Sequence, residues 1–343
     1  MVMVTEPDFK FVFKEFTDKD FRNEQFSIRV VNLDKGEFDF GFFDGRLSGN
    51  VDYYYRHTTD LLSEIDVPTG SNFTNRLMSN IGEMVNQGVE VSLNLIPVQT
   101  EDWNWTINLN GTWQQTEIGD LNDNFVKVGS SLSGTGGNSS LHYEGFAPYT
   151  FYLYQQAYDS NGKPLQNTFI DRDGDGRITE DDKYITGRSS TPDFYYGISM
   201  QLNYKNWDFG FNGHGSIGNY AINKLAVDNS TTYCGTLSYS YLRNLNEYNF
   251  RTGFTGNGTT EQAYSDLFVE NASFFRLDDI NLGYTFREVG KSKMNIRVAA
   301  SCQNVFVITD YSGLDPEVSS ADGVYSTLIP RPRLYTLRLN INF

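Results

Sequence analysis

Residues 171–182 read DRDGDGRITEDD, and their types and spacing suit the binding of a hard cation. Carboxylates at alternate positions around a glycine supply the oxygen ligands that hold Ca²⁺ in EF-hand loops. The last loop position is Asp rather than Glu, and the preceding GKPLQNTFI reads as extended, so a calcium-sensing helix pair is not expected. The pattern predicts a structural calcium clamp, with Asp171, Asp173, Asp175, the carbonyl of Arg177, Thr179 and Asp182 as candidate ligands.

The same stretch has a second interpretation that needs no metal. TEDDKYI at 179–185 fits one helical turn, with Thr179 as the N-cap. Carboxylates in a first turn are stabilised by the positive end of the helix dipole. From sequence alone, the calcium clamp and the acidic turn both stay open.

Other polar residues form no recognisable catalytic pattern. The three histidines, His57, His142 and His214, are scattered, and the chain has no HExxH or GxSxG motif. The neighbouring carboxyl groups of Asp278 and Asp279 are of the type that glycosidases use, but a loop or interfacial pair is the favoured interpretation. We therefore do not expect an enzyme.

Composition excludes some functional classes. The chain of 343 residues has 43 acidic and 27 basic residues and a net charge of −16, so it should repel nucleic acid. Cys234 and Cys302 have no metal-ligand spacing, and no disulfide is expected. The N-terminal residues show no signal-peptide pattern, and no apolar run reaches about 18 residues. Strands of a membrane barrel need only about 9–11 residues, with one apolar side.

The dominant pattern is an alternation of apolar and polar residues. In WNWTINLNGTW (103–113), the odd positions from Trp103 to Leu109, and again Trp113, are apolar, whereas the even positions are Asn or Thr. This period of two predicts a strand with one lipid-facing side and one wet side. Nine such strands are expected, at 26–42, 47–55, 89–95, 103–113, 196–204, 207–217, 280–286, 296–302 and 333–343.

The predicted connections alternate in length. Short turns fall at 43–46, 97–102, 205–206 and 287–292, and long loops at 62–85, 118–191, 219–271 and 309–330. A membrane barrel places short turns on one side and long loops on the other. Bacterial barrels have an even number of strands, so nine indicates part of a larger barrel. Aromatic residues inside the longest loop are candidate ligand contacts: Tyr149, Phe151, Tyr152 and Tyr154.

Several stretches together resemble the SusC/RagA-type TonB-dependent outer-membrane transporters of Bacteroidetes. They are FFDGRLSGNVDYYYRHTTDLL (42–62), NIGEMVNQGVEVSLNLIPV (80–98), FIDRDGDGRITEDDKYITGRSSTPDFYYGISMQLNYKNWDFGF (169–211), SFFRLDDINLGYTF (273–286), CQNVFVITDYSGLDPEV (302–318) and RPRLYTLRLNINF (331–343). The resemblance covers residues 24–343, and residues 1–23 are an atypical N-terminal segment.

The resemblance implies an all-β fold: a section of about nine antiparallel strands of a 22-strand transmembrane barrel with long extracellular loops. It also implies a plug and a TonB-contacting segment that precede this sequence, a SusD-like surface lipoprotein as partner, and an oligosaccharide or peptide as substrate. The alternating last strand, with Tyr335, Leu337, Leu339, Ile341 and Phe343 on its apolar side, then resembles the C-terminal assembly signal of outer-membrane barrels.

The sequence therefore predicts the C-terminal barrel wall of an outer-membrane nutrient importer, in contact with outer-membrane lipid. Two alternatives from other classes stay open. One is a secreted, calcium-stabilised, all-β carbohydrate-binding module. The other, weaker one is a glycan-cleaving β enzyme.

Overall fold

The computed structural model describes residues 9–14, 28–66, 76–80, 82–121, 126–132, 137–230, 247–255, 258–317, 320–325 and 329–342. For 9–14, 28–34, 62–66 and 76–80 it describes the backbone alone.

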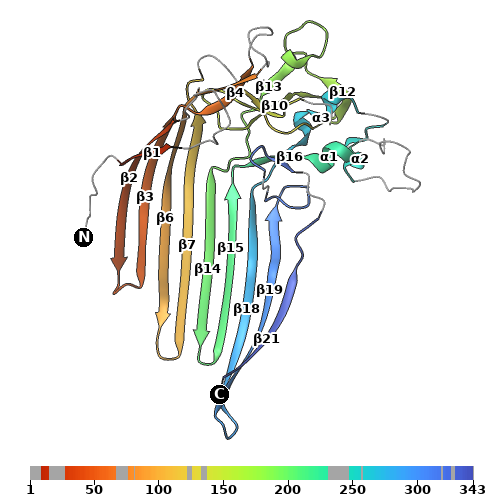
Figure 1. Cartoon of the computed structure of the whole chain (residues 1–343). Helices are drawn as coiled ribbons and strands as arrows, with labels where there is room; N and C mark the ends of the chain where they lie inside the picture. Colours follow the sequence, from red (N-terminus) through yellow and green to blue (C-terminus); the bar gives the residue numbers. More distant parts are fainter. Residues whose placement is uncertain are drawn as a thin grey trace, which may run out of the picture.

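The main element is one antiparallel sheet of ten strands, called the wall below (Figure 1). Its spatial order is β1-β2-β3-β6-β7-β14-β15-β18-β19-β21, and its two edges do not close on each other. The nine predicted strands are all present, which confirms the antiparallel barrel section. The bounds are β1 (Phe9–Lys14), β2 (Ile28–Phe42), β3 (Leu47–Thr59), β6 (Met84–Gln99), β7 (Trp103–Ile118), β14 (Phe194–Tyr204), β15 (Trp207–Ile217), β18 (Phe274–Val289), β19 (Met294–Thr309) and β21 (Leu334–Asn342).

The tenth strand, β1, lies within the segment 1–23 that the sequence leaves unassigned. It pairs with β2, with Phe9 opposite Leu33. Because the wall has ten strands, the odd count of nine no longer indicates a partial barrel.

Short turns join the wall strands at one end, as the alternation of loop lengths predicts. Between β2 and β3, Asp44 and Gly45 have φ angles of 56° and 82°, and the Arg46 N–H donates to the Phe43 carbonyl at 3.2 Å. Between β14 and β15, Lys205 has a φ angle of 53°. Left-handed backbone at such positions matches the twist of the paired strands.

The long segments fold into a cap, which we define as the described residues of 61–83, 119–193, 218–273 and 310–333. In Figure 1 the cap lies at the end of the wall opposite the short turns. Its strands are β4 (Leu62–Asp66), β5 (Arg76–Asn80), β8 (Val126–Val128), β9 (Ser140–His142), β10 (Thr150–Tyr154), β11 (Gln156–Tyr158), β12 (Pro164–Phe169), β13 (Lys183–Ile185), β16 (Tyr220–Asn223), β17 (Val269–Asn271) and β20 (Val324–Tyr325). Its helices are α1 (Lys224–Asn229), α2 (Glu247–Thr252), α3 (Thr260–Ala263), η1 (Glu180–Asp182) and η2 (Asp266–Phe268). None of the helices described is long and apolar enough to cross a membrane.

The main buried hydrophobic cluster belongs to the cap rather than to the wall. Phe151 and Leu153 of β10 are fully buried, and Ile222 of β16 is 1% exposed. They pack with Leu132, Tyr154, Phe169, Ala226, Tyr264, Phe268 and Val269. A single-layer wall has no second layer to cover it, whereas the cap forms a core of its own. The predicted long loops therefore form a folded layer.

Candidate functional site

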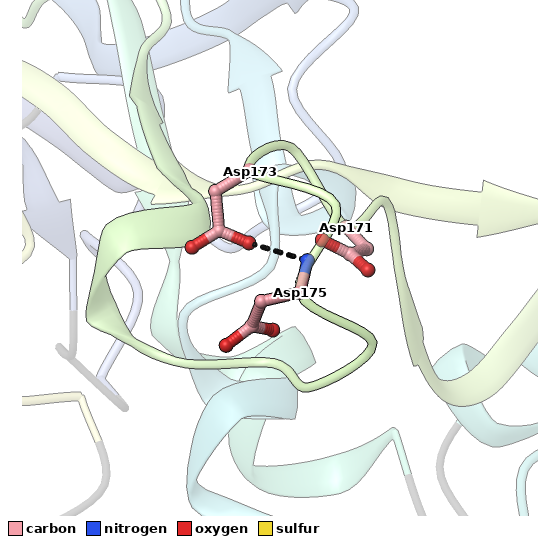
Figure 2. A group of neighbouring side chains, drawn as sticks. All are labelled: Asp171, Asp173 and Asp175. Carbon is pink, nitrogen blue, oxygen red and sulfur yellow. Dashed lines mark hydrogen bonds between the residues drawn. The ribbon is translucent and has the colours of Figure 1, made fainter.

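The acidic stretch forms a tight loop between β12 and η1. Carboxylate oxygens of Asp171, Asp173 and Asp175 lie within 4.8 Å of one another. Figure 2 shows the three side chains around the turn of the loop. Asp171 accepts the Gly174 N–H at 2.6 Å and the Gly176 N–H at 2.9 Å. Gly174 and Gly176 have φ angles of 77° and 80°, a conformation that glycine adopts readily.

Asp182, another candidate ligand, is not part of this acidic group. Asp182 is fully buried and accepts two backbone N–H groups, from Arg172 at 2.7 Å and from Thr179 at 2.8 Å. Thr179 is the N-cap of η1, as the metal-free interpretation expects, and its hydroxyl accepts the Asp181 N–H. The Arg177 N–H donates to Asp175 at 2.7 Å. Asp182 thus joins Arg172 and Thr179, on the two sides of the turn, by hydrogen bonds. The carboxylates of Asp171, Asp173 and Asp175 lie together at the turn of the loop.

The two kinds of carboxylate also differ in their pKa. The Thr179 and Arg172 N–H groups lower the pKa of Asp182, because they stabilise its charged form. For Asp173, the Asp175 N–H lowers the pKa, but desolvation and the carboxylates of Asp175 and Asp182 outweigh it, so the net shift is upward. A bound cation would reduce the repulsion between the carboxylate of Asp173 and the carboxylates around it.

The aromatic stretch of the longest loop was expected to contact a ligand, and for two residues this is wrong. Phe151 is fully buried and Tyr154 is 5% exposed, because β10 runs through the core of the cap. Burial raises the pKa of the Tyr154 hydroxyl. Tyr149 and Tyr152 are partly exposed. Tyr152 donates to the Glu180 carbonyl at 3.2 Å, so it braces the acidic loop.

His214 and the paired carboxyl groups form contacts between β15, β18 and the 310–333 segment. His214 Nδ1 lies 2.6 Å from Asp278 and its Nε2 lies 3.7 Å from Glu317. Asp279 instead accepts the side-chain amide of Asn212 at 2.7 Å. Among the described residues, Asp278 and Asp279 are therefore engaged with different partners on β15.

A buried ion pair beside His214 fastens the cap to the wall. Arg276 of β18 is 3% exposed and donates to Asp315 at 2.5 Å, and Asp315 is 5% exposed. Arg331 lies 3.1 Å from Asp315 and 2.7 Å from Glu317. This ionic clasp, formed by Arg276, Asp315, Glu317 and Arg331, joins the 310–333 segment to the inner face of the wall.

Strand register turns the alternation into two continuous faces. One row crosses eight strands as directly opposite pairs: Leu47, Leu95, Ile107, Met200, Phe211, Ile280, Cys302 and Tyr335. This outer face leaves large apolar groups uncovered, with Trp207 48% and Leu337 83% exposed. The next row, on the inner face, is Ser48, Asn94, Asn108, Ser199, Asn212, Asp279 and Gln303.

The inner face has a polar pocket between β7, β14 and β15. Its volume is about 340 Å³, and Gly197 is one of its lining residues. Asn110 and His214 are directly opposite Gly197 on the two neighbouring strands. The other inner-face side chains of the pocket are Asn108, Thr112, Tyr195, Ser199 and Asn212.

Comparison with known proteins decides what this wall belongs to. The TonB-dependent receptor SusC of Bacteroides thetaiotaomicron is 39% identical over 337 residues, which cover 94% of this chain and 32% of SusC. The TonB-dependent receptor P26 of Formosa agariphila is 29% identical and covers 88% of the chain. The structure of the RagAB peptide transporter superposes with a TM-score of 0.72 at 23% identity, over 97% of this chain and 38% of that one. No family model matches the chain.

The chain belongs to the SusC/RagA family of TonB-dependent transporters.

It spans about a third of the length of these SusC-like relatives. The chain is thus part of a β-barrel in the bacterial outer membrane, with the cap outside the cell. The outer face meets lipid, and the inner face lines the lumen of a SusC/RagA-type barrel. The resemblance read from the sequence is confirmed.

Two features of this SusC/RagA wall were missed at the sequence level. Alternation assigns Asn110 to the polar side of its strand, but it does not say that Asn110 lies opposite Gly197 and diagonally across from Tyr195. Arg276 of β18 and Asp315 of the 310–333 segment are 39 residues apart. The first feature depends on cross-strand register and the second on the path of a loop, and a single strand encodes neither.

Proposed function

We propose that the chain forms part of the wall and the extracellular cap of a TonB-dependent importer of oligosaccharides or peptides. The single observation that carries the proposal is the two-faced wall, apolar outside and polar inside, in a chain 39% identical to SusC. Uptake would be gated passage, with a SusD-like surface lipoprotein and the TonB system as partners. A secreted module fits less well, because a soluble sheet rarely leaves such an apolar face uncovered.

Uptake by cells tests this proposal. Cells that carry the complete transporter should accumulate a labelled oligosaccharide or peptide, and cells without it should not. Depletion of TonB should abolish accumulation, because the active transport proposed here needs energy from the inner membrane. Accumulation that continues without TonB would contradict the proposal.

We further propose that the acidic loop binds Ca²⁺ as a structural brace of the cap. The convergence of Asp171, Asp173 and Asp175 supports this, together with the raised pKa of Asp173. Calorimetry on the intact transporter should show Ca²⁺ binding that Asp173→Ala removes. Asp159→Ala is the matched control, because Asp159 also accepts backbone N–H groups in a turn of the cap, between β11 and β12. Binding that Asp173→Ala leaves unchanged would contradict the site.

We also propose that β21 carries the assembly signal of the barrel. Tyr335, Leu337, Leu339 and Ile341 lie on its outer face, and Phe343 lies outside the described residues. Leu339→Ala should lower the assembled fraction of the intact transporter, measured as the heat-modifiable band on a gel. Asn340→Ala, on the inner face, should not. Equal effects of the two changes would contradict the proposal.

A further inference from the structure

The pocket at Gly197 lies in the extracellular half of the inner wall. Gly197 is the fourth residue of β14, which begins at the cap end (Figure 1). A Cβ at position 197 would lie 2.7 Å from the Asn110 amide oxygen, so glycine keeps the floor of the pocket open. The volume of about 340 Å³ is at the lower end of the range for small-molecule sites, roughly 300–1,000 Å³.

The lining offers hydrogen bonds of both kinds and little charge. Asparagine side chains each have two donors and an acceptor, and Ser and Thr hydroxyls both donate and accept. Asn108 donates to Ser199 at 3.2 Å, whereas the side chains of Asn110 and Thr112 have no hydrogen-bond partner among the described residues. The selectivity of a pore depends on the hydrogen-bonding groups and the charges that line it, so this lining favours a solute that forms hydrogen bonds.

The charged groups at the rim are already engaged. Asp279 accepts from Asn212, and Asp278 lies against His214. Arg276 is held by the ionic clasp. The lining contains no Lys or Arg, and its histidine, His214, already faces Asp278 and Glu317. An anionic ligand therefore meets no lysine or arginine in the pocket, and a cationic ligand meets carboxylates that already have partners.

Tyr195 adds an aromatic surface to this polar lining. It is 45% exposed and lies next to Thr112 across the β7–β14 pair. The exposed ring offers an apolar face, and the amides and hydroxyls beside it offer hydrogen bonds. A sugar matches both, because its C–H groups can pack on the ring while its hydroxyls bond to the polar side chains.

We propose that this pocket is a subsite for one sugar unit of a neutral oligosaccharide on its way into the lumen, with Asn110 and Thr112 bonded to hydroxyls and Tyr195 against the ring. The inference rests on the proposed import function and deepens it, because it chooses neutral sugar over peptide or charged glycan.

Binding to the intact transporter, purified from the outer membrane, tests the subsite. The probes are maltoheptaose, an inulin-type fructo-oligosaccharide and mannohexaose, with penta-alanine and trilysine as peptide probes. Asn110→Leu and Tyr195→Ala should each weaken binding of the sugar that binds the native transporter, by about tenfold. Asn203→Leu, on the same inner face of β14 but near the short turn, should change the affinity by less than about twofold.

Three results would overturn the subsite. The first is binding of the peptide probes alone, and the second is a sugar affinity that both variants leave unchanged. The third is a lower folded fraction of the variants with an unchanged affinity of the folded protein. That third result would indicate that these side chains contact another part of the barrel. TonB-dependent sugar uptake that both variants leave unchanged would remove the subsite and leave the import proposal standing. Absence of TonB-dependent uptake would instead contradict the import proposal itself.

Discussion

Arginine in place of Ile107 should strongly destabilise the barrel. Ile107 lies on the outer face of β7, between Leu95 and Met200 on the neighbouring strands. Trp103 precedes it by four residues and Trp113 follows it by six, on the same face. About 9–11 residues of a tilted strand cross the bilayer, so the two tryptophans mark its two interfaces and Ile107 lies near the midplane. Arginine at that depth costs about 2–4 kcal/mol.

Two matched variants on β7 separate depth and face from the mere addition of charge. Gln115→Arg is on the outer face, two residues beyond Trp113, and should cost only about 0–1 kcal/mol because it lies in the interface or beyond it. Asn108→Arg is next to Ile107 but on the inner face, where its side chain is exposed. It should be tolerated, because the lumen is wet.

Refolding of the intact transporter into lipid vesicles measures the three costs. A loss of about 2–4 kcal/mol corresponds to a fall of about 30- to 700-fold in the folding equilibrium constant. Denaturant titration, read by the heat-modifiable band, reports this constant. Equal costs for Ile107→Arg and Asn108→Arg would refute the assignment of the two faces.

Three further predictions concern the cap. Arg276→Met should lower the free energy of unfolding by about 3–5 kcal/mol, because it leaves the buried Asp315 without its main partner. Thermal unfolding should show that adding Asp315→Leu to this variant restores part of the lost stability. Tyr184 donates to Asp266 at 2.7 Å, and desolvation together with this carboxylate raises the pKa of Tyr184 to about 12. Absorbance at alkaline pH should therefore show Tyr184 ionising later than an ordinary tyrosine, and Asp266→Asn should reduce the difference. The pKa of Asp182 is lowered, so its stabilisation of the loop is complete at neutral pH and is lost as pH falls through the lowered pKa. In the native protein, hydrogen exchange of residues 170–185, corrected for intrinsic rates, should therefore rise only in that acid range. In Asp182→Asn it should be raised at all pH values.

The wall was predictable because its information is local. Each strand carries its own period of two, so Trp103 and Asn104 reveal their opposite faces without knowledge of any neighbour. The turn at Asp44 and Gly45 was also predictable, because left-handed backbone restricts the residue types that fit.

The cap and the pocket were not predictable in the same way. Phe151 and Tyr154 look like ligand-binding aromatics in a polar loop, but they are buried because distant segments such as β16 fold over them. The register between β7 and β14 places Asn110 opposite Gly197 and Thr112 opposite Tyr195 on the inner wall. These two strands are separated in the sequence by the 119–193 segment. Sequence separation of this size hides which side chains meet.

Spin labels along β7 of the intact transporter in outer-membrane vesicles test the central claim most directly. Labels at 105, 107 and 109 should be accessible to dissolved oxygen, and labels at 106, 108 and 110 to a water-soluble nickel complex. The account predicts this strict alternation, because one side of the strand meets lipid and the other lines the lumen. Equal accessibility of odd and even positions to the nickel complex would contradict it.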